Sequence, residues 1–509
     1  MSGAHGILAE VHAVALVGLA PHRVRIECSR ASGLPGLRLV GLPDTAVREA
    51  EDRIRTAIQR SGLHWPQERV VVNLAPADLP KVGTGFDLAL ALAVLAATEQ
   101  IPARSLVGTW ACGEVGLDGS VRPVPGTLPT AVGARDLAAE RLIVATPAAG
   151  EAALVDGIEV VGVSDLAEVV EVLRGSRRPA EVVAAPTTLG DTTLELADVR
   201  GQPVARRAVE IAAAGSHHLL LAGPPGCGKS MLARRLHALL PPLELPHALE
   251  VAAIHSLAGE RPPDAPLSLV PPLREPHHSV SAAGLVGGGS GLPRPGELAL
   301  AHRGVLLLDE LLETPRWVLD ALRQPLERGE VTITRARARV RYPARVLMVA
   351  ATNPCPCGHL GDVRRACTCR PDRIERYRSR LSGPLLDRLD LQVEVQPVDL
   401  DRLAVDADGE TTATVGVRVH TARRAARARW GTGVANAHAT SAQVRSTTSA
   451  SALRTLARAI DGLALSARAF DRTLRVARTI ADLAEEPEVG SRHIEEALAY
   501  RIASPVAAG

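Results

Sequence analysis

Residues 217–240, HHLLLAGPPGCGKSMLARRLHALL, constrain the fold of this chain more than any other segment. An apolar run is followed by a glycine-rich loop and a helical pattern, and the loop matches G-x-x-x-x-G-K-[ST]. In such a strand–loop–helix unit, backbone N–H groups and the positive end of the helix surround phosphate oxygens. The segment therefore predicts an α/β domain that binds a nucleotide. The predicted cofactor-binding residues of the loop are Gly223, Pro224, Pro225, Gly226, Cys227, Gly228, Lys229 and Ser230.

The scarcity of lysine supports this prediction. Only two of the 58 Lys and Arg residues are lysines, Lys81 and Lys229. A lysine in so arginine-rich a chain is expected where a compact ammonium group is required. Lys229 is expected to reach the β- and γ-phosphates of ATP, and the Ser230 hydroxyl to hold Mg²⁺.

Two further apolar runs end in polar residues. GVLLLDE, at 304–310, predicts a buried strand followed by Asp309, expected to hold the Mg²⁺ shell, and Glu310, expected to polarise the attacking water. RVLMVAATN, at 345–353, predicts a strand that ends in Asn353, which is expected to orient this water or contact the γ-phosphate. Taken singly, the acids could be helix-start charges and the Asn a turn residue, so the assignment depends on the three motifs together.

The chain is too long for one hydrophobic core and divides into four predicted parts. Residues 1–173 alternate short apolar runs with helical patterns, residues 174–191 have the composition of a linker, residues 192–398 carry the nucleotide motifs, and residues 399–509 are helical. In the first part, strands are predicted at 24–28, 69–76 and 141–146, and an amphipathic helix at 45–62.

Composition excludes several classes of protein. Glu10 and His12 interrupt the apolar start of the chain, so a secretory signal is not expected, and no uncharged apolar run is long enough to span a membrane. We therefore predict a cytoplasmic protein. Aromatic residues make up 2% of the chain, which disfavours a surface that grips single strands by stacking bases. Because the net charge is only +2, a surface that binds DNA would have to be a local patch of basic residues.

Four of the seven cysteines lie within fifteen residues, in NPCPCGHLGDVRRACTC. They form two Cys-x-Cys pairs: Cys355, Cys357, Cys367 and Cys369. Four thiolates can surround a tetrahedral Zn²⁺ ion at ~2.3 Å, although Cys-x₂-Cys pairs are commoner in zinc sites. A loop with reduced, unliganded thiols is the alternative, and both interpretations stay open. We assign His277, His278 and His359 to loop structure.

Longer blocks of the sequence resemble a known family. GPPGCGKSMLA, GVLLLDELLE, LRQPLERGEVTITRA, YPARVLMVAATNPCPCG, RLSGPLLDRLDLQVEV and LSARAFDRTLRVARTIADL are similar to the magnesium-chelatase-like AAA+ ATPases of the ComM/YifB type. VGLPDTAVREAEDRIRTAI and VVVNLAPADLPKVGTGFDLALAL extend the resemblance to the N-terminal part. It implies a P-loop AAA+ core, an N-terminal Lon-protease-like α/β domain and a C-terminal helical lid. It also implies a hexameric DNA motor that drives branch migration during recombination and natural transformation.

The resemblance implies further roles for arginines. Arg388, in LLDRLD, matches the arginine finger that enters a neighbouring subunit's site, and Arg468, in LSARA, matches the sensor arginine of the lid. Arg335 and Arg337 lie in VTITRARARVRY, which resembles the DNA-contacting hairpin of related ring helicases. An exposed edge hairpin kept soluble by charge is the alternative for this segment. The chain departs from the family where LLET follows Glu310 and where Cys replaces Thr or Ser in the loop.

The Lon-like domain is not expected to be a peptidase. Lon-type proteolysis needs a Ser nucleophile activated by a Lys. The resemblance puts Gly85 at the serine position and Pro129 at the lysine position, and Lys81 is the only lysine outside the phosphate loop.

Several functions remain in competition. A DNA motor that uses ATP and Mg²⁺, binds branched or double-stranded DNA, forms a hexameric ring and has no membrane partner is the leading interpretation. A magnesium-chelatase ATPase subunit shares the core but needs neither the N-terminal domain nor the cysteine loop. The missing Ser–Lys pair argues against an ATP-dependent protease, and the complete nucleotide motifs argue against a scaffold without activity.

Overall fold

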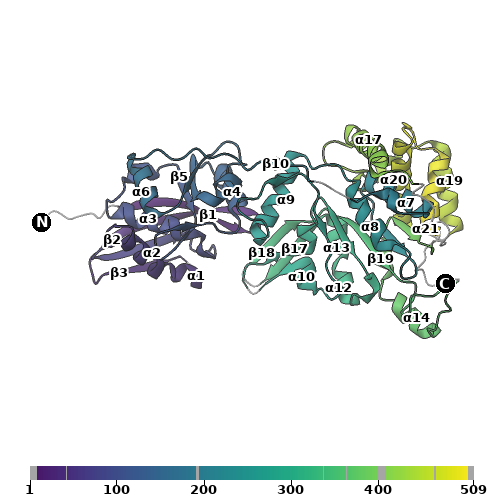
Figure 1. Cartoon of the computed structure of the whole chain (residues 1–509), viewed down its shortest axis with the longest axis horizontal. Helices are drawn as coiled ribbons and strands as arrows, with labels where there is room; N and C mark the ends of the chain where they lie inside the picture. The colour runs from purple at the N-terminus through teal and green to yellow at the C-terminus, as the bar shows by residue number, and fades with distance from the viewer. Residues whose placement is uncertain are drawn as a thin grey trace.

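The computed structural model of the chain describes residues 8–41, 43–190, 194–289, 291–335, 338–362, 364–397, 409–463 and 466–502. Figure 1 shows an elongated molecule in which the N-terminal domain lies at one end, while the parallel-sheet core and the C-terminal helices pack together at the other. No helix in these ranges combines the length and the apolar character that a membrane span requires.

The N-terminal domain is built on a seven-stranded mixed sheet with the order β3-β4-β2-β1-β5-β8-β9. Its strands are β1 (Ala9–Val17), β2 (Ala20–Ala31), β3 (Gly36–Val40), β4 (Arg69–Ala75), β5 (Thr109–Cys112), β8 (Arg141–Ala145) and β9 (Glu159–Val163). Its longer helices are α2 (Ala50–Arg60), α3 (Asp87–Ala97), α4 (Thr127–Asp136), α5 (Thr146–Ala152) and α6 (Leu166–Arg174). The α3 helix is buried along its whole length, which explains why DLALALAVLAA is apolar on all sides.

The expected elements of this domain are confirmed with one difference. The predicted strands correspond to β2, β4 and β8. The predicted helix at 45–62 is two helices, α1 (Thr45–Arg48) and α2, which meet at Glu49. The Asp44 side chain caps the first of them by accepting a hydrogen bond from the backbone of Val47 at 2.9 Å.

The core contains a five-stranded sheet with the order β13-β16-β19-β11-β20, in which all neighbours are parallel. The strands are β13 (Leu273–Arg274), β16 (Val305–Leu308), β19 (Leu347–Thr352), β11 (Leu219–Ala222) and β20 (Leu391–Glu394). Three of them, β11, β16 and β19, are buried throughout, as expected for a parallel sheet covered on both faces. The helices α7 (Pro203–Gly215), α8 (Lys229–Ala238) and α9 (Leu245–Ala258) belong to the same unit.

Two segments connect the N-terminal domain to the core. The predicted linker contains β10 (Thr187–Thr188), which pairs in parallel with β12 (Leu267–Ser268). A hairpin of β17 (Glu330–Arg335) and β18 (Ala338–Pro343) packs Val340 against Gly18, where any side chain would collide. The composition of the linker does not predict the pairing of β10 with β12. Both residues of β10 are exposed and pair through their backbone, which leaves no apolar period in the sequence.

The C-terminal part contains α17 (Thr412–Trp430), α18 (Ser441–Arg445), α19 (Ala450–Gly462), α20 (Ala467–Leu483) and α21 (Ser491–Ile502). A buried polar cluster joins three of its segments. The Asp482 carboxylate accepts hydrogen bonds from Arg478 at 2.9 Å and from Arg429 at 2.6 Å. It also accepts one from the Asn436 amide at 2.8 Å. The Asp482 carboxylate is the counter-ion of Arg478, whose side chain is fully buried.

We expect Asp482→Asn to lower the melting temperature of the full-length protein by several degrees. The substitution leaves the buried charge of Arg478 without its counter-ion, and breaking such a pair costs about 3–5 kcal/mol. Asp471→Asn is the matched control, because Asp471 meets Arg445 only at 3.9 Å on the surface, where a pair contributes at most about 1 kcal/mol. Differential scanning fluorimetry would compare the two variants. Equal melting temperatures would contradict a stabilising role for the cluster.

Candidate functional site

Close backbone approach shapes the predicted phosphate loop, residues 223–230, hereafter the P-loop. Gly223 directly follows β11, and a Cβ atom here would collide with the carbonyl oxygen of Val395 beyond β20. Gly226 and Gly228 have φ values of +78° and +94°, which favour glycine. Gly228 caps α8, so the first backbone N–H groups of this helix, which have no partner within the helix, lie at the end of the loop.

Lys229 lies inside the loop. Its side chain is 8% exposed, and Nζ donates to the carbonyl oxygens of Gly223 at 2.7 Å and Pro224 at 2.8 Å. It also donates to Asn353 Oδ1 at 3.2 Å. Burial lowers the pKa of the Lys229 ammonium group. The structure thus brings together the lysine of the first motif and the asparagine that follows the third predicted strand.

The predicted Mg²⁺ ligands are also adjacent. Ser230 Oγ donates to Asp309 Oδ2 at 2.6 Å, and the other Asp309 oxygen accepts from the backbone N–H of Glu310 at 2.9 Å. Both acidic side chains are exposed at the carboxyl edge of the sheet. A hydroxyl and a carboxylate that share one edge are the oxygen donors that Mg²⁺ uses in proteins.

Glu310 has a backbone conformation that few side chains adopt. Its φ is +50° and its ψ is +43°, which for a residue other than glycine costs of order 1 kcal/mol. Its carboxylate lies 3.0 Å from His278 Nδ1. This contact makes His278, which the sequence predicts to serve loop structure, a candidate functional residue. The position of PHH, which begins one residue beyond the end of β13 in the same parallel sheet, is the signal that points to it.

The predicted arginine finger and sensor are Arg388 and Arg468. Arg388 is 9% exposed; its guanidinium donates to the carbonyl oxygen of Pro384 at 2.6 Å and forms an ion pair with Glu327. Arg468 is exposed at the start of α20. Within the described ranges, neither side chain forms a hydrogen bond or ion pair with the P-loop. Arg472 of α20 donates to the carbonyl oxygen of Arg388 at 2.7 Å, which connects the helical domain to this segment.

The β17–β18 hairpin has an apolar and a basic face. Val331, Ile333, Val340 and Tyr342 are buried. Arg339 and Arg341 are exposed on the other face, where they pair across the hairpin with Thr334 and Thr332. Arg335 is also exposed, but it follows Ile333 by two residues and so lies at the tip end of the apolar face. Arg337 lies outside the described residues. Arg339 and Arg341 are not among the predicted DNA contacts, although the alternation in RARARVRY has the period of two that is typical of a strand.

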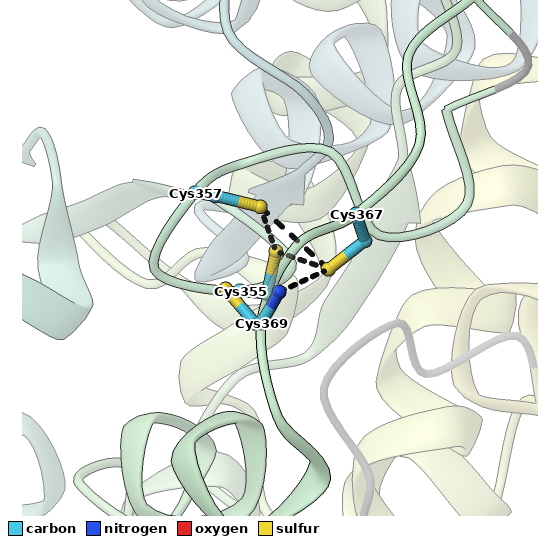
Figure 2. Close-up of side chains that lie close together, drawn as sticks. All are labelled: Cys355, Cys357, Cys367 and Cys369. Carbon is cyan, nitrogen blue, oxygen red and sulfur yellow. Dashed lines mark hydrogen bonds between the residues drawn. The ribbon is translucent and has the colours of Figure 1, made fainter.

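The four clustered cysteines converge in space, as Figure 2 shows. Their sulfur atoms all lie within 4.8 Å of one another. Cys355 Sγ is 3.4 Å from Cys357 Sγ and 3.6 Å from Cys367 Sγ, too far for a disulfide of about 2.05 Å. Hydrogen bonds from the backbone N–H groups of His359 and Thr368 lower the pKa of the Cys357 thiol to about 5, which favours the thiolate that metals bind.

A cavity of about 470 Å³ lies beside the P-loop. One wall is residues 198–202, which precede α7, and a second is the P-loop itself. A third wall comes from the cysteine loop: His359, Asp362, Arg364 and Arg365. The cavity has the dimensions of a small-molecule site, and it opens next to the loop whose backbone is arranged for phosphate.

The N-terminal domain lacks a Ser–Lys pair in its described part. Gly85 lies in a short 3₁₀ turn and Pro129 in α4, so neither expected catalytic position carries a reactive side chain. Lys81 is fully buried, and its ammonium donates to the carbonyl oxygen of Pro76. Burial lowers the pKa of this ammonium group. The lysine therefore has a structural partner and no nucleophile to activate.

Comparisons with known proteins cover nearly the whole chain. Three family models match: "Subunit ChlI of Mg-chelatase" at residues 26–148, "Magnesium chelatase, subunit ChlI" at 195–403, and "Magnesium chelatase, subunit ChlI C-terminal" at 409–501. An uncharacterised protein of Mycobacterium tuberculosis is 46% identical over 97% of this chain and 98% of its own length. The competence protein ComM of Haemophilus influenzae is 43% identical over 97% of both chains.

A magnesium-chelatase 38 kDa subunit of Rhodobacter capsulatus matches a smaller part: it is 30% identical over 35% of this chain and 52% of its own length. The full-length relatives thus share every domain with this chain, whereas the chelatase subunit matches only a part of it. The chain belongs to the magnesium-chelatase-like AAA+ ATPases of the ComM/YifB type.

Proposed function

We propose that this protein is an ATP-hydrolysing DNA motor that assembles into a hexameric ring and drives branch migration in recombination and natural transformation. The observation that carries the proposal is the polar cluster at the carboxyl edge of the core sheet. There Lys229 contacts Asn353 at 3.2 Å, and Ser230 contacts Asp309 at 2.6 Å. A P-loop lysine, a hydroxyl and a strand-end carboxylate in this arrangement are the parts that bind ATP with Mg²⁺.

Each residue of the cluster has a role that follows from its position. Lys229 exchanges its carbonyl partners for β- and γ-phosphate oxygens, because these carry full negative charge. Ser230 and Asp309 would hold Mg²⁺, which neutralises charge on the phosphates. Glu310 accepts a proton from the attacking water, and Asn353 orients that water. The contact between His278 and Glu310 restrains this carboxylate, so His278 acts as a positioning residue.

The proposed ring follows from the placement of Arg388. Its guanidinium forms no hydrogen bond with the P-loop of its own chain in the described ranges, so its expected role requires the site of a neighbouring subunit. Its ion pair with Glu327 has to open, or to lie at the subunit boundary, when the arginine engages a γ-phosphate. Arg472, which bonds the same segment, would transmit movement of the helical lid and its Arg468 to the finger.

The proposed DNA grip is the basic face of the β17–β18 hairpin. Exposed arginines on one face of a strand pair suit contacts to phosphates, which carry no sequence information. Such contacts fit a motor that moves along DNA of any sequence. The name of the Haemophilus relative, a competence protein, supports a role in competence.

A chelatase subunit is the second candidate, because the matching family models carry that name. One feature favours the motor over it. The Rhodobacter chelatase subunit matches only 35% of this chain, whereas the Haemophilus competence protein matches 97% of it. The absence of a Ser–Lys pair in the described N-terminal domain disfavours proteolysis.

The proposal extends to a Zn²⁺ ion in the four-cysteine cluster. Zn²⁺ prefers thiolate ligands in tetrahedral geometry. Four ligands at ~2.3 Å from one ion lie about 3.8 Å from one another, close to the 3.4–3.6 Å separations among Cys355, Cys357 and Cys367. Such an ion would have a structural role, because all four positions of the tetrahedron are filled by protein.

The roles of Lys229 and Glu310 can be separated by substitution. Lys229→Ala is expected to abolish tight ATP binding, because the lysine contacts phosphates in the bound ground state. Glu310→Gln is expected to preserve binding and lower turnover by about 10²-fold or more, since it removes the general base. Fluorescent-nucleotide binding and phosphate release would measure the two effects. Wild-type turnover by Glu310→Gln would refute the assignment of the catalytic carboxylate.

Mixed rings test whether Arg388 acts on a neighbour. Arg388→Ala and Glu310→Gln proteins are each expected to be inactive, since an arginine finger supplies ~10³-fold or more in rate. Their mixture is expected to regain activity at interfaces that combine a wild-type site with a wild-type finger. A mixture of Lys229→Ala with Glu310→Gln is the control and is expected to show no recovery. Both substitutions damage the site of their own chain, so every site in this mixture lacks either Lys229 or Glu310. No recovery in the first mixture, despite co-assembly, would exclude a shared site.

The hairpin can be tested through salt dependence. Arg339→Ala/Arg341→Ala protein is expected to bind ATP normally, lose DNA-stimulated hydrolysis, and show a salt slope shallower by roughly 1–2, because each phosphate contact contributes about 0.9 to it. Arg454→Ala/Arg458→Ala, which removes two exposed charges from α19, controls for net charge. DNA affinity measured over a salt series gives the slopes. Identical salt slopes for the two variants would indicate that the arginines of the hairpin do not contact DNA phosphates.

A further inference from the structure

The cysteine loop, residues 353–370, packs directly against the P-loop. Gly358 has a φ of +84°, and a Cβ atom at this position would lie 2.5 Å from Cδ of Pro225. Only glycine permits both this conformation and this approach. The loop also begins at Asn353, which contacts Lys229. The two loops are therefore joined at two points.

The same loop forms one wall of the cavity beside the P-loop. His359 and Asp362 line it and hold each other, with Nδ1 of His359 3.0 Å from Oδ2 of Asp362. The opposite wall consists of residues 198–202. A nucleotide with its phosphates in the P-loop would extend its base or ribose into this cavity. The cysteine loop thus contributes to the surface that would contact the nucleotide.

The loop has little structure of its own to maintain this position. Its described residues contain no helix or strand, and of the four cysteines only Cys355 is fully buried. The other three sulfurs, which are half-buried, gain little free energy by gathering away from water. A metal ion accounts for their convergence, and metal binding supplies folding free energy to segments that lack an apolar core.

We infer that Zn²⁺ bound by Cys355, Cys357, Cys367 and Cys369 holds the cysteine loop against the P-loop and thereby sets the affinity of the site for ATP. The ion is a structural clamp of the nucleotide cavity and takes no part in the hydrolysis step. The inference rests on the proposed ATP site. It connects the two centres through the contact between Gly358 and Pro225 and through the cavity wall at His359 and Asp362.

Removing two ligands tests the clamp. Full-length wild-type protein is expected to contain about one zinc per chain by mass spectrometry of the metal, as one tetrahedral site requires. Cys367→Ser/Cys369→Ser is expected to lose it and to bind a fluorescent ATP analogue about tenfold more weakly or worse, a change equal to about 1.4 kcal/mol. Cys112→Ala, in the N-terminal domain, controls for loss of a thiol and should keep both zinc and affinity.

The outcomes separate the clamp from the ATP site itself. Lys229→Ala is expected to keep its zinc and lose the nucleotide. A wild-type protein that binds zinc but no nucleotide would refute the proposed function. Wild-type protein without zinc would refute the inference and leave the ATP site standing. The same follows if the cysteine variant loses zinc and retains wild-type affinity.

A glycine pair tests the contact without touching the ligands. Gly358→Ala and Gly361→Ala both place a side chain at positive φ, +84° and +80°, in the same loop. An added Cβ meets Pro225 at Gly358, whereas nothing lies within 4 Å of the one at Gly361. Both variants are expected to retain zinc, and only Gly358→Ala to weaken nucleotide binding, by about tenfold. Equal nucleotide affinities in the two variants would contradict the coupling of the cysteine loop to the ATP site, even if both variants bind zinc.

Discussion

The parallel pairing of β11 with β19 is the constraint on which the nucleotide site depends. In this register Ala222 lies beside Thr352, so both strands end at the same level of the sheet. The P-loop therefore begins where Asn353 emerges, and Lys229 reaches both. The pairing of β16 on the other side of β19 brings Asp309 to the same edge. A register shift of one residue would turn the side chains of a strand to the opposite face and disperse the cluster.

The sequence could predict this cluster because each of its members follows an apolar run. Runs of that kind predict buried parallel strands, and the carboxyl ends of parallel strands meet at one edge. The same reasoning did not reach His278, since β13 contains only two residues and leaves no apolar run to identify. The alternation around Arg339 and Arg341 indicates a strand. It does not show which face of the hairpin packs inward, so the exposure of these two arginines could not be predicted.

Contacts between distant backbone segments could not be predicted. The approach of Gly358 to Pro225 and the pairing of β10 with β12 depend on tertiary position, and composition carries no trace of them. The ion pair of Arg388 with Glu327 is of the same kind. These contacts connect the P-loop, the cysteine loop, the N-terminal domain and the segment that carries Arg388. The sequence therefore predicts which residues form the site better than it predicts the contacts between the site and distant segments of the chain.

The most direct measurement of the central claim is the steady-state ATPase rate of the full-length protein with each candidate effector. We predict that a four-way DNA junction raises the rate several-fold over the basal rate, and that protoporphyrin with Mg²⁺ leaves it unchanged. The stimulated rate should fall with increasing salt, because the grip depends on arginine–phosphate contacts. Stimulation by the porphyrin and none by branched DNA would contradict a DNA motor and favour the chelatase interpretation.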